Sequence, residues 1–95
     1  MPAVARLGDP DTGHGCYPSR VCVSAASTVY VNGIAVHRLG DAWESHCCGP
    51  VCHGAQTAAG SGTVYVEGMA VARIGDPLDC GGSISAGSGD VFIGG

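Results

Sequence analysis

The chain has 95 residues and a formal net charge of −4, from four Arg, no Lys and eight acidic side chains. A chain of this length forms one domain and buries only about 60% of its unfolded surface, so it usually needs a metal ion, disulfides or a partner. Nucleic acids and anionic membranes are bound through cationic side chains, so the acidic balance argues against both as partners. We therefore expect a single domain of residues 1–95 that binds no nucleic acid.

In chain order, the predicted elements are parts of one repeat. Residues 3–9, AVARLGD, form a return arm that lacks its first arm. Residues 29–41, VYVNGIAVHRLGD, and 64–76, VYVEGMAVARIGD, are complete copies, identical at nine of 13 positions. Residues 91–95, VFIGG, supply the missing first arm. The split copy predicts that the chain ends meet and that three units close into a pseudo-threefold object, rather than stacking openly as a solenoid or propeller fragment.

Each unit has the pattern strand, turn, strand. The Val-Tyr-Val arms are β-branched and aromatic, and Asn32-Gly33 and Glu67-Gly68 are two-residue hairpin signals. Gly94-Gly95 holds the same place in the split unit, so Gly95 is expected beside Met1 and Pro2. In no window of the sequence do apolar residues recur with the period of about 3.6 residues that is typical of a helix. We predict an all-β fold, a pseudo-threefold β-prism or cone of three split hairpin repeats, with short extra strands near residues 20–24, 56–59 and 83–85.

The six cysteines and four histidines indicate metal chemistry. The N-terminus lacks a signal pattern and no apolar run approaches the about 20 residues of a membrane helix, so we expect the chain to be made and kept in the cytosol unless a machine exports it. Because the cytosol keeps thiols reduced, we expect the cysteines to serve a metal rather than disulfides.

A metal-type residue follows each Gly-Asp by four or five positions, and these residues are His14, His46 and Cys80. Equivalent positions of three symmetric units converge on the axis, where a fourth ligand would complete the tetrahedron that Zn²⁺ prefers. His53, in a long loop expected over residues 42–54, is the best candidate. Four protein ligands leave no open position, which is typical of a structural site holding one Zn²⁺ per chain.

Other histidines and cysteines have competing interpretations. Three cysteines lie between His46 and His53 and compete for the fourth position: Cys47, Cys48 and Cys52. Cys22 alternates with valines and is expected in the core. Cys16 is a loop thiol, a core filler or a group behind the ligands. His37 replaces the Ala of the other two arms and is expected to be a surface or packed residue.

The Arg-x-Gly-Asp turn recurs three times, which suits a structural role that bridges neighbouring units and fixes the turn. The residues are Arg6, Asp9, Arg38, Asp41, Arg73 and Asp76. There is no Gly-rich phosphate loop and no paired-carboxylate signature. Cys80 with a nearby His is the only nucleophile and base candidate, and those side chains are better used as metal ligands. We therefore expect no enzymatic activity.

The return arms at residues 2–9, 34–41 and 69–76 resemble the repeats of PAAR proteins, named for Pro-Ala-Ala-Arg. Val4, Val36 and Val71 stand at the third motif position, and only the first copy keeps Pro. The resemblance implies a small β-rich cone with a zinc ion near its apex, bound by three His and one Cys. In this chain those ligands would be His14, His46, His53 and Cys80.

The resemblance also implies a function. PAAR proteins cap the trimeric spike of type VI secretion systems and contractile phage tails, with the base of the cone on VgrG or its phage counterpart, and members can carry effector proteins. We expect one chain per trimer, which starts in the bacterial cytoplasm and reaches the tip of the machine or the phage baseplate, where it pierces a target membrane. The alternatives are a small zinc-binding adaptor unrelated to injection, and a small thiol or zinc enzyme.

Overall fold

The computed structural model describes residues 1–94, and in this range it contains strands and no helix. The predicted all-β fold is therefore confirmed. Six strands form three two-stranded antiparallel sheets. Their bounds are β1 (Tyr30–Val31), β2 (Ile34–Ala35), β3 (Ala42–Cys48), β4 (Val51–Gln56), β5 (Tyr65–Val66) and β6 (Met69–Ala70). Within residues 1–94 no helix is long and apolar enough to span a membrane.

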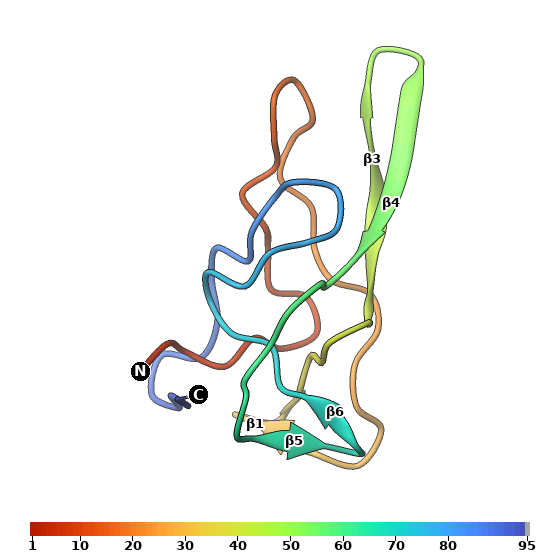
Figure 1. Cartoon of the computed structure of the whole chain (residues 1–95). Coiled ribbons are helices and arrows are strands. Elements are labelled where there is room, and N and C mark those ends of the chain that lie inside the picture. The colour runs from red at the N-terminus through yellow and green to blue at the C-terminus, as the bar shows by residue number, and fades with distance from the viewer. Residues whose placement is uncertain (95) are drawn as a thin grey trace.

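The molecule is elongated, with extents of 38 × 24 × 22 Å. Figure 1 shows the β1–β2 and β5–β6 hairpins and both chain termini toward one end, which we call the hairpin end. The β3–β4 hairpin and the loops over residues 10–20 and 77–84 extend toward the other end, which we call the loop end. Each end has its own buried apolar cluster, centred on Val4, Val36 and Val71 at the hairpin end and on Trp43 and Ile84 toward the loop end.

The two complete repeats form the predicted hairpins. Both central turn residues have positive φ: 56° and 76° at Asn32 and Gly33, and 54° and 80° at Glu67 and Gly68. This is the backbone of the type I′ turn, whose twist matches that of the flanking strands. The turn residues of the sequence therefore set the register, with Val31 opposite Ile34 and Val66 opposite Met69.

The split unit is joined across the chain ends. Ala3 pairs with Phe92 in an antiparallel bridge, and the Ile93 amide donates to the Pro2 carbonyl oxygen at 3.0 Å. A Cβ on Gly94 would lie 3.3 Å from the Met1 sulfur, so the two ends are in contact. The predicted neighbourhood of Gly95 lies outside the described residues.

The three return arms are tied into a ring by backbone hydrogen bonds. The amide of Ala5 donates to the carbonyl of Ala72, Ala72 to His37, and His37 to Ala5, at 2.9, 3.0 and 3.0 Å. All three residues are fully buried. Of the two predictions for His37, a surface residue or a packed one, the structure shows the packed one. Its ring hydrogen-bonds the Ser24 carbonyl oxygen and the Thr57 hydroxyl.

The Arg-x-Gly-Asp turns repeat the same contacts. The guanidinium meets the carboxylate three residues later in all three turns, Arg6 with Asp9 (3.1 Å), Arg38 with Asp41 (2.8 Å) and Arg73 with Asp76 (3.1 Å). Its other side reaches the turn of another hairpin, at Asn32 (3.1 Å), Glu67 (2.5 Å) and Gly94 (3.2 Å). Each arginine therefore has one contact within its own turn and one to another hairpin, the two contacts that the predicted structural role requires.

Residues 42–54 do not form the expected long loop. They lie in the β3–β4 hairpin, the longest in the structure, which continues to Gln56. A bulge between Trp43 and His46 breaks the alternation of buried and exposed residues, which hid the strand from the pattern. The short extra strands expected near residues 20–24, 56–59 and 83–85 are isolated bridges, at Val21, Cys22, Thr57, Ser83 and Ile84.

The prediction that the cysteines serve a metal rather than disulfides is wrong for four of the six. Disulfides join Cys16 to Cys48 and Cys47 to Cys52. The β3–β4 register sets Cys47 opposite Cys52, while the neighbouring Cys48 side chain points to the other face of the strand. The competitors for the fourth ligand position are thereby used in disulfides. Cys22 is a buried thiol in the core, as predicted.

Candidate metal centre

Four predicted ligands come together from three segments of the chain. His14 lies in the loop after the first return arm, where its backbone pairs with Tyr17 in a tight turn. His46 on β3 stands directly opposite His53 on β4. Cys80 comes from the loop after the third return arm. One ligand atom from each of the four residues lies within 4.8 Å of all the others.

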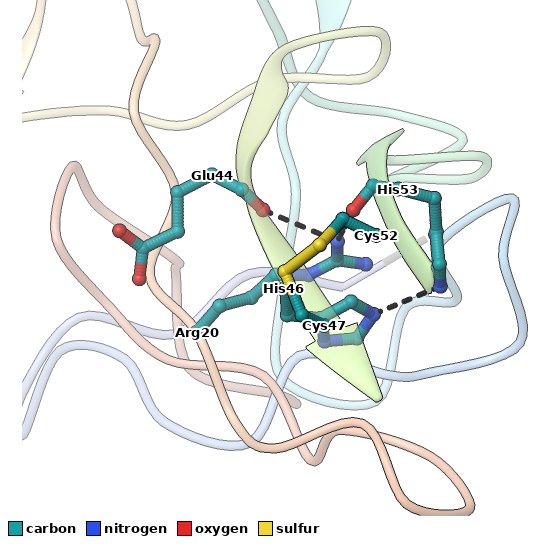
Figure 2. Close-up of a disulfide and its surroundings, with 6 residues drawn as sticks. All are labelled: Arg20, Glu44, His46, Cys47, Cys52 and His53. Carbon is teal, nitrogen blue, oxygen red and sulfur yellow. Dashed lines mark hydrogen bonds between the residues drawn. A yellow bond between two sulfur atoms is a disulfide. The ribbon is translucent and has the colours of Figure 1, made fainter. Parts of the chain in front are cut away.

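The two hairpin histidines present nitrogen lone pairs to one another. His46 Nδ1 lies 2.8 Å from the Pro18 carbonyl oxygen and His53 Nδ1 lies 3.1 Å from that of Gly54. A carbonyl only accepts, so in the neutral rings the proton sits on Nδ1 and Nε2 is a free acceptor. The two Nε2 atoms are 3.1 Å apart (Figure 2). A tetrahedral zinc ion would hold two imidazole nitrogens about 3.3 Å apart, so this pair fits a metal.

His14 supplies a further unsatisfied nitrogen. Its Nε2 is buried and has no hydrogen-bond partner. The His14 ring lies 4.9 Å from that of His46 and 5.1 Å from that of His53, between centroids. Burial lowers the pKa of His14, and the neighbouring His46, His53 and Arg20 lower it further. The neutral imidazole that a metal requires is therefore the favoured form.

The fourth group, Cys80, is one of two free thiols in residues 1–94 and is half-buried. Arg20 Nη2 donates to its sulfur at 2.7 Å. Sequence reasoning missed Arg20 and its partner Asp11. The available signal was that Arg20 is the one arginine outside the Arg-x-Gly-Asp turns.

The disulfides hold the segments that carry the ligands. Cys16 and Cys48 each lie two residues after a histidine, so their bond joins the His14 loop to the His46 strand. The Cys47–Cys52 disulfide links the register pair next to His46 and His53. The Tyr17 ring lies 4.5 to 4.9 Å from all three histidine rings and covers them. The centre is thus fixed by covalent bonds as well as by packing.

Three imidazoles and one thiol form a donor set typical of zinc, and their number fills a tetrahedron. An oxygen-preferring ion such as Mg²⁺ or Ca²⁺ would find no carboxylate among them. The arrangement suits a metal that crosslinks loops and leaves no coordination position for a substrate.

Comparison with protein families agrees with the resemblance to PAAR proteins in the sequence. A family model described as the PAAR motif matches residues 12–86, more than three quarters of the chain. No curated protein matches the chain.

Proposed function

Because the chain belongs to the PAAR-motif family, we propose that it is the structural, zinc-binding tip of the spike of a contractile injection machine. The observation that carries this proposal is the cluster of His14, His46, His53 and Cys80 toward the loop end. The chain would start in the bacterial cytoplasm and be carried outward at the tip of a type VI secretion spike or phage tail. As a blunt spike gains a narrow, rigid end, it would pierce a target membrane more easily.

A bound Zn²⁺ would crosslink the loops that carry the four ligands. Each imidazole would use Nε2 where Nδ1 is held by a backbone carbonyl, as in His46 and His53. One thiolate leaves the centre formally +1, and the Arg20–Asp11 ion pair beside it adds no net charge. Structural zinc sites contribute on the order of 10 kcal/mol to the folding of small peptides. The proposed role of the ion is therefore to stiffen loops that have only a thin core of their own. With all four positions filled by protein, we infer no catalytic role.

The hairpin end supports docking on a threefold partner. A cavity of about 160 Å³ opens there, and its lining is entirely aliphatic. Each unit contributes corresponding residues: Val29, Val31 and Val36; Val64, Val66 and Val71; Val91, Ile93 and Val4. Aromatic side chains at one repeated position are all exposed, Tyr30 and Tyr65 by 58% and 59% and Phe92 by 48%.

We propose that this face has pseudo-threefold symmetry and seats one chain on the blunt end of a trimeric β-helical spike such as VgrG. Three similar edges of one chain would each meet one subunit, and spike strands could pair with hairpin edges by β-augmentation. Apolar surface repeated three times on a small acidic chain is typical of an interaction face. Effector proteins could travel with the tip as separate chains.

The test is the composition of the complex that this chain forms with a trimeric VgrG-type spike protein. Native mass spectrometry should give one copy of this chain per spike trimer. Replacing Tyr65 with Asp at the hairpin end should prevent the complex while leaving the metal content unchanged. Three copies per trimer would contradict the pseudo-threefold docking, and a complex unaffected by Tyr65→Asp would place the docking face elsewhere.

A further inference from the structure

Arg20 and Asp11 form the most deeply buried ion pair among residues 1–94, and neither belongs to a repeated turn. The Arg20 side chain is 1% exposed, and that of Asp11 is fully buried. Arg20 Nε donates to Asp11 Oδ2 at 3.1 Å. A buried ion pair is costly to desolvate and is weak evidence for stability by itself. Its place beside the metal ligands therefore points to a role in the centre.

The remaining guanidinium hydrogen bonds all go to segments that carry ligands. Nη1 donates to the carbonyl oxygens of Glu44 and His53, both at 3.2 Å (Figure 2). Nη2 donates to the Cys80 sulfur at 2.7 Å. One planar side chain thus touches β3, β4 and the Cys80 loop at once, a geometry that the fork of Arg allows and the single ammonium of Lys does not.

Asp11 extends these contacts to the loop that carries His14. Its Oδ1 accepts the amide of Gly13 at 3.1 Å and that of Arg20 at 2.9 Å. Gly13 adjoins His14, and a Cβ at Gly13 would lie 2.6 Å from the Tyr17 carbonyl oxygen. The Asp11 carboxylate therefore fixes the tight loop that positions the His14 ring.

We propose that Arg20, held by Asp11, is a positioning residue of the metal centre that donates a hydrogen bond to the Cys80 thiolate and sets the metal affinity. This inference rests on the proposed metal site. A thiolate bound to a cation keeps lone pairs that accept a hydrogen bond, and a charged donor makes that bond strong. Arg20 also holds the sulfur and the backbone of β3 and β4 in place before the metal arrives, so less reorganisation accompanies binding. Partners of this kind change metal affinity by about 10- to 100-fold when they are replaced.

The test compares Arg20→Lys with Arg73→Lys. Both variants keep the positive charge and lose a fork that pairs with an aspartate, but only Arg20 touches the centre. Competition with a chromophoric chelator should show a Zn²⁺ affinity about 10- to 100-fold weaker for Arg20→Lys. The affinity of Arg73→Lys should equal that of the wild type. Equal affinities for all three proteins would overturn the proposal.

A spectroscopic measurement separates a bond to sulfur from general support. In the Co²⁺-loaded protein, loss of a hydrogen bond to the thiolate raises the sulfur lone pair in energy, so the charge-transfer band should move to longer wavelength in Arg20→Lys. The same substitution in a Cys80→His background should cost much less affinity, because no thiolate remains to be stabilised. An unmoved band together with an equal cost in both backgrounds would make Arg20 merely structural.

The outcomes distinguish this inference from the proposed metal site. A wild-type protein that binds no Zn²⁺ removes both, whereas tight wild-type binding with an unaltered Arg20→Lys removes only the role of Arg20. If Arg20→Lys does not fold, Asp11→Asn decides, because it keeps the guanidinium and an Oδ1 acceptor for Gly13 but removes the countercharge and the Oδ2 acceptor of Arg20 Nε. Its Zn²⁺ affinity should fall in the same direction, and an unchanged affinity would refute the proposal.

Discussion

The two ends of the molecule, each with only a small hydrophobic core, are stabilised by different kinds of contact. At the hairpin end, three similar units share one set of contacts: the backbone ring through Ala5, His37 and Ala72, and an Arg–Asp pair in each turn. Toward the loop end the three units keep one candidate ligand each at a similar position but differ in length and structure. One unit carries the long β3–β4 hairpin, whereas the other two carry shorter loops with a single candidate ligand each. Repetition therefore specifies the scaffold and three candidate ligand positions, and the long hairpin of one unit adds the fourth candidate, His53.

The difference predicts where crosslinks matter. Toward the loop end, two disulfides and the proposed metal add crosslinks to the apolar cluster around Trp43 and Ile84. At the hairpin end, close backbone packing and aliphatic side chains hold the units together. Removing a crosslink should therefore weaken the structure and zinc binding of the loop end alone. Forcing the backbones apart should weaken the structure of the hairpin end.

The largest effect is expected from Cys80→Ser. The variant should lose bound zinc, and its free energy of unfolding should fall by about 5 kcal/mol or more, because structural zinc contributes on the order of 10 kcal/mol in small domains. Elemental analysis and thermal unfolding with and without chelator measure both effects. The chelator should bring the wild type down to the variant and leave the variant unchanged.

Cys22→Ser is the matched control for that experiment. Cys22 is the other free thiol of residues 1–94 and is 1% exposed, and burial raises its pKa to about 11. Its replacement should weaken the core yet keep one zinc per chain. Unchanged zinc content in Cys80→Ser would remove Cys80 from the ligand set.

The next effect distinguishes the two disulfides. Loop-closure entropy depends on the number of residues enclosed, and the sequence separation is 32 for Cys16–Cys48 but 5 for Cys47–Cys52. Replacing the first pair by Ser should lower the unfolding free energy by about 4 kcal/mol, and replacing the second by about 2 kcal/mol. Denaturant unfolding of the metal-free proteins measures this, since removing the metal leaves only the covalent constraint. A larger effect for Cys47–Cys52 would show that strand register at the histidine pair outweighs chain entropy.

A smaller effect at the hairpin end comes from Gly87→Ala. A Cβ at Gly87 would lie 2.5 Å from the Val4 carbonyl oxygen, so the backbones would have to separate. We expect a loss of about 1–3 kcal/mol, as for other overpacked sites. Gly89→Ala is the control, because its Cβ would meet nothing within 4 Å. Zinc content should be unchanged in both, and zinc loss in Gly87→Ala would contradict the independence of the two ends.

Most of the scaffold could be predicted from the sequence, and for a physical reason. Hairpin turns depend on local backbone preference, so Asn32-Gly33 and Glu67-Gly68 specify their own geometry. Repetition then relates each unit to the others, which predicted that the first residues of the chain meet residues 91–94. The convergence of His14, His46, His53 and Cys80 followed from the same counting together with the resemblance to PAAR proteins.

The features that sequence reasoning missed depend on contacts without a local signal. The sequence pattern predicts a loop in place of the β3–β4 hairpin, because the bulge between Trp43 and His46 breaks the alternation. The disulfides were missed because an argument from cellular compartment says nothing about which sulfurs lie together. Arg20 reaches Cys80 from 60 residues away, and only the folded chain brings the two side chains together.

The smallest predicted effect is a pH dependence that originates at His37, where the two ends adjoin. Trp43 Nε1 donates to Thr57 Oγ1 at 2.9 Å, Thr57 lies 2.6 Å from His37 Nε2, and His37 Nδ1 lies 3.0 Å from the Ser24 carbonyl oxygen. This chain works only with a neutral ring, in which Nδ1 donates and Nε2 accepts the hydroxyl proton. A proton on Nε2 would leave Thr57 with two donors and no acceptor for its own hydrogen.

Burial is the largest cause and lowers the pKa of His37; the Ser24 carbonyl and Asp41 oppose it, and Arg38 adds a smaller lowering effect. As the pH falls, His37 of the unfolded chain therefore binds a proton at a higher pH than His37 of the folded chain. The contribution of His37 to stability is complete above the unfolded pKa of 6.5 and is lost as pH falls from there through the lower folded value. The difference in unfolding free energy between wild type and His37→Gln should shrink across this window, whereas titration of the metal ligands is common to both proteins and cancels. A difference that stays constant from about pH 8 to about pH 5 would show that folding leaves the pKa of His37 unchanged, and Thr57 would then have to bond elsewhere once the ring is protonated.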